Sequence, residues 1–355
     1  MSSEAAKSRP TVRAVAAAAG VSAMTVSLAM RNHPRIPAPT RLLVRRAAAK
    51  LGYRPDPVVA KLMHHLRVGR TPGYQSTIGA LTTIAEGADE PYLADIVQNA
   101  RRRAEELGYS FSVFRIDDES GARPALQRLL RSRGVEGLIL LPIAKPRVMA
   151  EVLDWRDFAV VTTTFGVLSP EFHRVVPHQF GNGLQICQQL VRSGYRRIGL
   201  VLPAEHDLRV HHGFSGAVSW QNLLGGTEFV RPFIHEATLP TPRGLQQWFK
   251  RERPDVIIAA GDKECRLIAT LLGLRAPGPI GFVSANKAGR SAFAGIEEQP
   301  AEIGATAIEQ LAGMIQRGEK GIPAVPKVTM IDGRWIGGRS VRVAPVRTRV
   351  RVTPA

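Results

Sequence analysis

The sequence has few cysteines, no long apolar run and fewer acidic than basic residues. Its two cysteines, Cys187 and Cys265, give no metal-ligand spacing and no disulfide framework. No apolar run approaches the roughly 18–20 residues that cross a membrane. With 44% hydrophobic and 22% charged residues, the composition excludes disorder, collagen-like repeats and coiled coil as the main class. The 355 residues predict two or three globular domains.

The motifs of several common enzyme classes are also missing. There is no Gly-x-x-x-x-Gly-Lys-Ser/Thr phosphate loop, no His-Glu-x-x-His zinc motif and no Gly-x-Ser-x-Gly elbow. His64-His65 and His211-His212 are adjacent pairs, so they lack the i,i+4 helical spacing of a metal site. We therefore expect a protein that is not an enzyme and uses no metal or cofactor.

Acidic residues are outnumbered by 48 Lys and Arg to 30 Asp and Glu, a net charge of +18. Residues 1–70 hold a net charge of +11, residues 71–338 only +2, and the tail 339–355 has five arginines and no acid. A basic segment of this size usually faces a polyanion, most often nucleic acid. An Arg-biased solvated surface is the alternative. The tail suggests no specific role.

The first 70 residues have the cap and turn residues of short helices. Thr11 can cap a helix over 12–19 that ends at Gly20, and Ser22 can cap a second helix over 23–31. Two helices joined by so short a turn predict a helix-turn-helix. The apolar residues expected to face inward are Val12, Val15, Ala16, Val21, Val26 and Ala29.

Two further helices are expected before residue 70. The third spans about 38–51, and the fourth begins at Asp56-Pro57 and is followed by a linker at 69–73. The third helix has a basic outward face of Arg41, Arg45, Arg46 and Lys50. Its apolar residues at helical spacing are Leu43, Val44, Ala47, Ala48 and Leu51.

A secretory signal peptide is the alternative explanation of the N-terminus. Lys7, Arg9 and Arg13 precede 17 uncharged residues, as in the basic and apolar regions of a signal. That stretch contains glycine, serine and threonine and only one leucine, and a strongly basic segment follows it. The corresponding alternative function is a secreted periplasmic-type solute-binding protein.

Residues 74–338 alternate between apolar strand-like runs and helical segments. The expected helices are 92–107, 123–132, 183–193, 214–224, 243–251 and 263–272, and the expected strands are 78–84, 110–115, 137–141, 159–163, 198–202, 256–260 and 280–284. This alternation predicts parallel sheets flanked by helices, in two lobes with a cleft between them. Ligands of such sheets bind beyond the carboxyl ends of the strands.

The chain resembles the lactose-repressor (LacI/GalR-type) family of transcription regulators over about residues 11–342. In the headpiece the matching features are Ala19-Gly20-Val21-Ser22, Thr25-Val26-Ser27, Asn32, Thr40-Arg41 and Leu51-Gly52-Tyr53-Arg54-Pro55. In the body they are the segments 194–201, 253–262, 295–311 and 335–341. The resemblance implies an α/β protein with an N-terminal all-α helix-turn-helix headpiece and a two-lobed effector domain of the periplasmic-binding-protein type I fold.

The resemblance also implies a domain division and partners. It implies a headpiece at 1–54, a hinge helix and linker at 55–73, an effector-binding and dimerisation domain at 74–338, and the tail 339–355. Lobe 1 would span about 74–176 and 299–325, and lobe 2 about 177–298. Such a protein is a cytoplasmic homodimeric repressor that binds double-stranded operator DNA and a small-molecule effector, away from membranes.

Within the headpiece, the resemblance places Ala23 and Met24 where the family reads bases. Apolar side chains can contact thymine methyls but not guanine acceptors. Leu28 replaces an arginine common in the family. Leu62 would wedge into the minor groove from the hinge helix, or lie buried against the partner's hinge helix. The full set of expected DNA-binding residues is Thr11, Ser22, Ala23, Met24, Thr25, Ser27, Asn32, Arg41, Tyr53, Lys61 and Leu62.

The effector pocket matches the family less well. The sugar-binding positions of the family correspond here to His178, to Val210, to Gly261-Asp262 and to the vicinity of Asn286. Much of the polar set that sugar hydroxyls need is missing, so a common hexose effector is not supported. The expected cleft residues, each of which could instead be structural, are Tyr92, Phe165, His178, Arg209, His211, Asp262 and Asn286.

Overall fold

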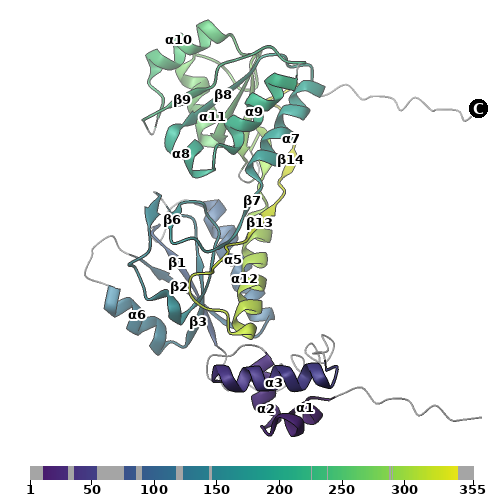
Figure 1. The fold of residues 1–355 in the computed structure, drawn as a ribbon. Coiled ribbons are helices and arrows are strands. Elements are labelled where there is room, and N and C mark those ends of the chain that lie inside the picture. The colour runs from purple at the N-terminus through teal and green to yellow at the C-terminus, as the bar shows by residue number, and fades with distance from the viewer. Residues whose placement is uncertain are drawn as a thin grey trace, which may run out of the picture.

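The structure is a computed structural model that describes residues 11–30, 36–53, 76–84, 90–116, 123–143, 146–224, 226–237, 239–287, 289 and 291–342. A small helical headpiece precedes two α/β lobes that follow one another along the length of the molecule (Figure 1). The headpiece consists of α1 (Val12–Ala19), α2 (Ala23–Met30) and α3 (Ala38–Lys50).

The headpiece confirms the predicted helix-turn-helix. The Thr11 hydroxyl accepts a hydrogen bond from the Ala14 amide at 3.3 Å, and Gly20 ends α1 in the left-handed region at φ 63°. Both are the cap residues that the sequence suggested. A small core joins the three helices, and its buried residues are Val15, Ala16, Ala19, Val26, Ala29, Val44 and Ala48.

The expected apolar face of α3 is only partly correct. Val44 and Ala48 are buried, but Leu43 is 50% exposed and Leu51 is 38% exposed. Val44 and Ala48 are one turn apart and face α1 and α2, whereas Leu43 lies outside the narrow strip that so small a core can cover.

No helix in the described ranges is by itself long and apolar enough to cross a membrane. Only α1 and α2 taken together meet that test, by length and composition, and they are bent by 101° at the break between them.

Lobe 1 is built on a six-stranded parallel sheet in the order β13-β7-β5-β3-β1-β2. Its strands are β1 (Thr77–Thr82), β2 (Ser110–Arg115), β3 (Val135–Leu140), β5 (Ala159–Thr162), β7 (His173–Pro177) and β13 (Val328–Ile331). Its helices are α5 (Pro91–Glu106), α6 (Arg123–Ser132), α12 (Pro300–Arg317) and a 3₁₀ turn (Trp155–Asp157). Two short strands, β4 (Arg147–Val148) and β6 (Val167–Ser169), pair separately.

Helices α5 and α12 lie side by side against one face of the lobe 1 sheet (Figure 1). Ile96 and Ala100 of α5 share a buried core with Ile303 and Leu311 of α12. Gly304 permits this approach, because a Cβ there would lie 2.4 Å from the carbonyl oxygen of Ile96. A segment late in the chain thus completes the first lobe.

Lobe 2 has a second six-stranded sheet in the order β14-β12-β11-β10-β8-β9, parallel except where β14 pairs with β12. Its strands are β8 (Ile198–Pro203), β9 (Phe233–His235), β10 (Val256–Gly261), β11 (Gly281–Asn286), β12 (Ala294–Glu297) and β14 (Arg334–Ile336). Its helices are α7 (Gln179–Arg192), α8 (Ala204–Arg209), α9 (Gly213–Leu224), α10 (Pro242–Glu252) and α11 (Asp262–Leu271). Buried residues of α7 and α9 form one core, and those of α10 and α11 form another.

The thirteen helices and strands predicted for the body are confirmed, with small shifts of their ends. The elements that were not predicted are β4, β6, β7, α8, β9, β12, α12, β13 and β14. Most are short and lie at sheet edges or next to the crossings between the lobes. Such strands have too few residues for an apolar pattern and form only when a neighbouring strand supplies hydrogen-bond partners.

Candidate functional site

The amino end of α2 presents to solvent the positions that are expected to read bases. Ala23 is exposed, and Met24 is 74% exposed although it is a large apolar residue. Ser22 caps this end: its Oγ accepts a hydrogen bond from the Thr25 amide at 3.0 Å and lies 2.9 Å from the Thr25 Oγ1. The cap fixes the first turn of α2, so the two apolar side chains project from a defined backbone.

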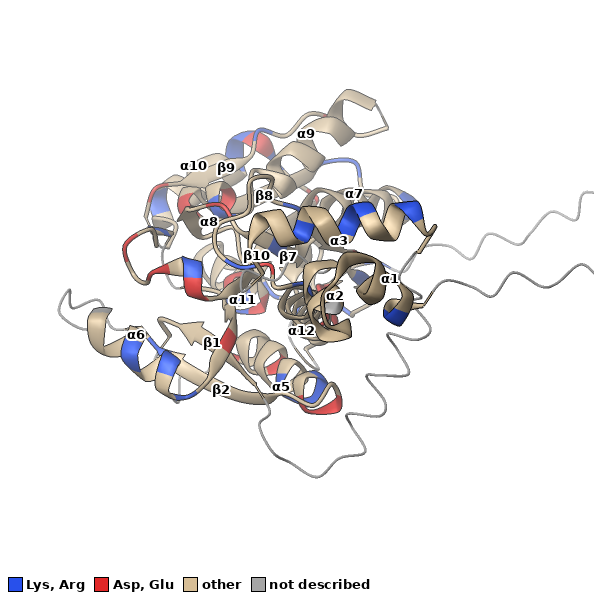
Figure 2. Cartoon of the chain, turned by 60° about the horizontal axis from the view of Figure 1, so that its bottom comes forward, with Lys and Arg blue, Asp and Glu red and all other residues tan. Residues whose placement is uncertain are grey.

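Basic residues lie on the two helices that pack against α2. Figure 2 shows Lys and Arg along α3 and at the start of α1. Arg45, Arg46 and Lys50 are exposed on α3, and Arg41 is partly buried near its start. Tyr53 follows α3 and packs against the headpiece core, so its ring helps to fix the end of that helix.

Several expected DNA-binding residues lie outside the described residues. These are Asn32 before α3, and Lys61 and Leu62 of the expected hinge helix. The same holds for most of the linker, for residues 343–355 of the tail and for the side chain of Ser27.

Three chain crossings connect the lobes, and hydrogen bonds hold them together. His178, which follows β7, places its Nδ1 2.7 Å from the Asp332 Oδ1 on the crossing between β13 and β14. Gln299, on the crossing between β12 and α12, donates to the Asp332 carbonyl at 2.6 Å. The Asn182 side chain accepts from the Gly333 amide at 2.8 Å. His178, expected in the cleft, therefore belongs to a hinge.

A buried carboxyl group occupies the centre of this hinge. Glu298 is 4% exposed, and its Oε1 accepts a hydrogen bond from the Gln179 side chain at 2.8 Å. Tyr92 of lobe 1 and Arg209 of lobe 2 also lie close enough to favour its ionised form. Burial outweighs these three influences and raises the pKa of Glu298 to about 7. Tyr92 and Arg209 are thus brought together around an acid that the sequence analysis did not select.

Arg209 also contacts a neutral histidine. Its Nη2 lies 3.0 Å from the Nδ1 of His206. Burial, reinforced by the charge of Arg209, lowers the pKa of His206 to about 4. The ring is therefore neutral at pH 7, and its Nδ1 can accept the guanidinium hydrogen.

A second contact between the lobes joins two aromatic rings. Phe165 of lobe 1 and His211 of lobe 2 have ring centroids 4.3 Å apart, tilted by 37°. His211 and His212 have φ angles of 51° and 56°, a left-handed conformation that is strained for consecutive non-glycine residues. Asp207 holds this turn, because its Oδ2 lies 2.8 Å from the His212 Nδ1 and accepts from the Ser215 hydroxyl at 3.0 Å. In this turn conformation, the His211 ring contacts Phe165 of the opposite lobe.

Asp262 and Asn286 lie at the carboxyl ends of neighbouring strands of lobe 2. Gly261 of β10 is in register with Asn286 of β11, and Asp262 follows as the first residue of α11. Asp262 is buried, and its Oδ1 has no hydrogen-bond partner. An unsatisfied buried oxygen at the ligand edge of such a sheet is suited to a hydrogen-bond donor from a ligand.

The structure adds four polar residues to those that the sequence suggested. Gln179 and Glu298 lie in the hinge, Asp207 fixes the strained turn, and Arg174 lies buried on β7. The pair Glu297-Glu298 at the end of an apolar strand could have indicated an acid at this crossing from the sequence alone. Arg174 and Asp207 carried no such signal, since their roles depend on partners distant in the sequence or on a turn conformation.

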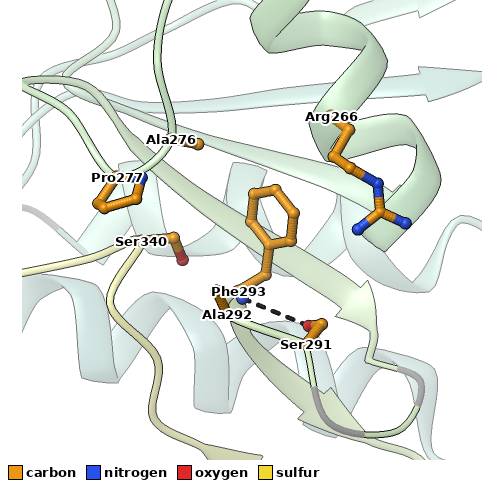
Figure 3. Close-up of a pocket in the computed structure, with 7 residues that line it drawn as sticks. All are labelled: Arg266, Ala276, Pro277, Ser291, Ala292, Phe293 and Ser340. Atoms are coloured by element: carbon orange, nitrogen blue, oxygen red, sulfur yellow. Dashed lines mark hydrogen bonds between the residues drawn. The ribbon is translucent and has the colours of Figure 1, made fainter.

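A pocket of about 230 Å³ opens elsewhere in lobe 2, close to the start of β12 (Figure 3). The Phe293 ring fills its centre, and the Arg266 guanidinium lies 5.9 Å from the centroid of that ring. None of the seven expected cleft residues lines this pocket. It is also small for an effector site, since ligand pockets usually span about 300–1,000 Å³.

Comparisons with known proteins agree with this architecture. Residues 11–56 match the family described as "Bacterial regulatory proteins, lacI family". Residues 76–211 match "Periplasmic binding proteins and sugar binding domain of LacI family", and residues 187–341 match "Periplasmic binding protein-like domain".

Similar whole proteins align over most of this chain. The HTH-type transcriptional repressor PurR of Yersinia enterocolitica is 24% identical over 351 residues, which cover 95% of this chain and 98% of the relative. PurR of Pectobacterium carotovorum is 25% identical and covers 77% of this chain and 79% of its own length.

Solved structures share the fold. The CelR–cellobiose complex aligns with a TM-score of 0.56 at 21% identity, covering 94% of this chain and all of that one. The Lac repressor dimer bound to operator and the anti-inducer ONPF aligns with a TM-score of 0.55 at 20% identity, covering 94% and 99%.

A helix-turn-helix headpiece joined to two lobes of the periplasmic-binding-protein type defines a ligand-responsive class of DNA-binding protein. Within that class, the chain combines a DNA-binding domain of the LacI-type family of bacterial regulatory proteins with periplasmic-binding-protein-like domains.

Proposed function

We propose that this protein is a sequence-specific DNA-binding repressor whose operator affinity is set by a small molecule bound between its lobes. The observation that carries the proposal is the headpiece, in which a capped helix projects two exposed apolar residues beside a basic helix. The related PurR proteins are repressors, which supports the same role here and argues against both an enzyme and a secreted solute-binding protein. We place it in the cytoplasm, where its DNA would be.

At the operator, α2 enters the major groove. Ala23 and Met24 contact base edges, and their apolar side chains favour thymine methyls. Hydroxyl, amide and basic groups position the headpiece on the phosphates without reading sequence. We assign this second role to Thr11, Ser22, Thr25, Ser27, Asn32, Arg41, Tyr53 and Lys61, and the minor-groove wedge to Leu62.

Four regions divide this work. Residues 1–54 read the operator, 55–73 form the hinge helix and linker, 74–338 bind effector and form the homodimer, and 339–355 are a basic tail. In the body, lobe 1 takes about 74–176 and 299–325, and lobe 2 about 177–298. Two-fold symmetry of a dimer matches an operator of two related half-sites.

Effector binding changes the relative position of the lobes at the hinge of Gln179, Glu298 and Asp332. Tyr92 of lobe 1 and Arg209 of lobe 2 both approach Glu298 on the crossing between the lobes. Phe165 of lobe 1 likewise contacts His211 of lobe 2. A ligand that binds one arrangement of these contacts more tightly shifts the population toward it. Asp262 and Asn286 supply further polar groups on the lobe 2 side.

The test selects operators from a random double-stranded library with full-length protein and measures affinity by fluorescence anisotropy. Met24→Ala should change the preferred half-site, because it removes an exposed side chain from the base-reading end of α2. Met330→Ala is the matched control, since Met330 is 52% exposed on β13, far from the headpiece in the sequence. It should select the wild-type sequence.

Salt dependence tests the phosphate contacts in the same assay. If a dimer contacts about six or more phosphates, affinity should fall about 10³-fold or more between 50 and 200 mM salt. Absence of DNA binding by the full chain at 50 mM salt would contradict the proposed function.

A further inference from the structure

One buried arginine at the ligand edge of lobe 1 has no carboxylate closer than 3.9 Å among the described residues. Arg174 is in β7, in register with Thr162, the last residue of β5. Arg174 is the second residue of β7, but it lies level with the carboxyl end of β5, which faces the second lobe and is the end where ligands of such sheets bind. It is only 8% exposed.

The charge of Arg174 is poorly compensated. In the described part of the chain, the carboxylate within 4 Å of its guanidinium is that of Glu171, at 3.9 Å from Nη1, and the Glu171 side chain is 64% exposed. The Arg174 Nε is buried and has no hydrogen-bond partner. A buried cation without a close counter-ion is costly, since desolvation takes several kcal/mol that a partner must offset.

Aromatic rings cover this guanidinium at the boundary of the lobes. Its carbon lies 5.7 Å from the centroid of the Phe165 ring, which in turn stacks on His211 of lobe 2. The pKa of His211 is lowered, first by burial and then by the positive charges of Arg174 and His212, against the opposite influence of Glu171. His211 is therefore neutral at pH 7 and supplies no counter-charge. Separation of the lobes would part the two rings and uncover the arginine.

We propose that Arg174 binds an oxyanion, a carboxylate or a phosphate group, of the effector, with Phe165 and His211 flanking the bound molecule. This inference rests on the proposed function and names the chemical class of its effector. The guanidinium fork can bind two oxygens of such a group at once, which gives both strength and orientation. The ligand would supply the close anion that the described part of the protein lacks at this position.

The proposal makes a separate prediction for the protein without ligand. Since no described carboxylate lies closer than 3.9 Å to Arg174, Arg174→Gln should leave the melting temperature of the anion-free protein unchanged or raise it. Removal of an arginine that mainly holds the fold would lower it. The same variant should lose the response to anions. Its affinity for anions would therefore fall while its melting temperature without anions stays the same or rises.

The experiment measures thermal unfolding of the full chain against increasing sodium phosphate, sodium benzoate or the neutral benzamide, at constant ionic strength set with sodium chloride. We expect a saturable rise in melting temperature with phosphate or with benzoate, and none with benzamide. Which of the two anions acts distinguishes a phosphate from a carboxylate effector. Arg174→Gln should weaken that response at least tenfold in anion concentration.

Two further variants complete the test. Arg133→Gln removes an exposed arginine at the end of α6, and it should keep the full response. Arg174→Lys keeps the charge but loses the guanidinium fork, so its response should fall between those of wild type and Arg174→Gln. If the glutamine variant does not fold, the comparison of Arg174→Lys with wild type still tests the proposal.

Equal responses of wild type, Arg174→Gln and Arg174→Lys, or no response of wild type to either anion, would overturn the proposal. Operator binding is measured on the same samples. Normal operator binding without an anion response refutes only the effector class, whereas an anion response without any DNA binding refutes only the proposed function.

Discussion

Replacement of Glu298 by glutamine tests whether the hinge contains an acid that resists ionisation. The carboxyl group is buried against Gln179 and Tyr92, with Arg209 nearby, and burial raises its pKa from 4.5 to about 7. Because the folded state holds this proton more tightly than the unfolded state, the contribution of Glu298 to stability is greatest below about pH 4.5. It falls as the pH rises toward 7 and is then constant.

The pKa gives the size of the effect. At 1.36 kcal/mol per pH unit, the rise from 4.5 to about 7 makes ionisation of Glu298 cost about 3 kcal/mol of stability above pH 7. Glutamine keeps the shape and the acceptor for Gln179 but carries no charge. Glu298→Gln should therefore have a free energy of unfolding up to about 3 kcal/mol higher than wild type at pH 8, and unfold at a higher urea concentration. At pH 4.5 the two proteins should unfold at nearly the same urea concentration.

Urea denaturation between pH 4.5 and pH 8, followed by circular dichroism, measures this difference. Glu297→Gln is the matched control: Glu297 is the preceding residue, 40% exposed, and pairs with Arg334 at 2.6 Å. It should shift stability by less than about 1 kcal/mol, as exposed ion pairs do. If Glu298→Gln is less stable than wild type at pH 8, or follows the same pH dependence, the buried acid does not behave as described.

Three other perturbations test separate parts of the structure. Asp207→Ala removes the acceptor that holds the turn at His211 and His212, and we expect a loss of about 2 kcal/mol in urea denaturation; unchanged stability would show that the turn does not depend on Asp207. Leu62→Ala should reduce operator bending in gel-mobility or energy-transfer measurements, and an unchanged bend angle would remove the wedge assignment. Burial raises the pKa of Cys187 to about 12 and raises that of Cys265 further, so neither thiol should react with a thiol reagent in the folded protein at pH 8; rapid labelling without denaturant would contradict their burial.

The sequence predicted the headpiece well because its signals are local. Thr11, Gly20 and Ser22 act on backbone groups within a few residues, so their types alone indicate where α1 ends and α2 begins. The same holds for the central strands and long helices of the body, whose apolar runs are long enough to show a period. The apolar face of α3 was harder to predict. Which of its leucines are buried depends on the size of the core that α1 and α2 form with it.

The sequence also predicted that the site would lie beyond the strand ends, and it identified residues from both lobes. It could not show how they combine. Tyr92, Arg209 and Glu298 come from three separate segments and meet only when the crossings between the lobes are assembled. The sequence also carried no sign that His178 contacts Asp332 at the crossings between the lobes, because Asp332 lies 154 positions further along the chain.

By itself, then, the sequence determined the basic headpiece, the helix-turn-helix and the two-lobed α/β body, since charge, caps and apolar periodicity are properties of neighbouring residues. Only the tertiary structure decided which acid is buried at the crossings between the lobes, which rings meet between the lobes and which arginine has no close carboxylate among the described residues. Burial and pairing depend on segments far apart in the chain, and their energies depend on how much water the assembled fold excludes.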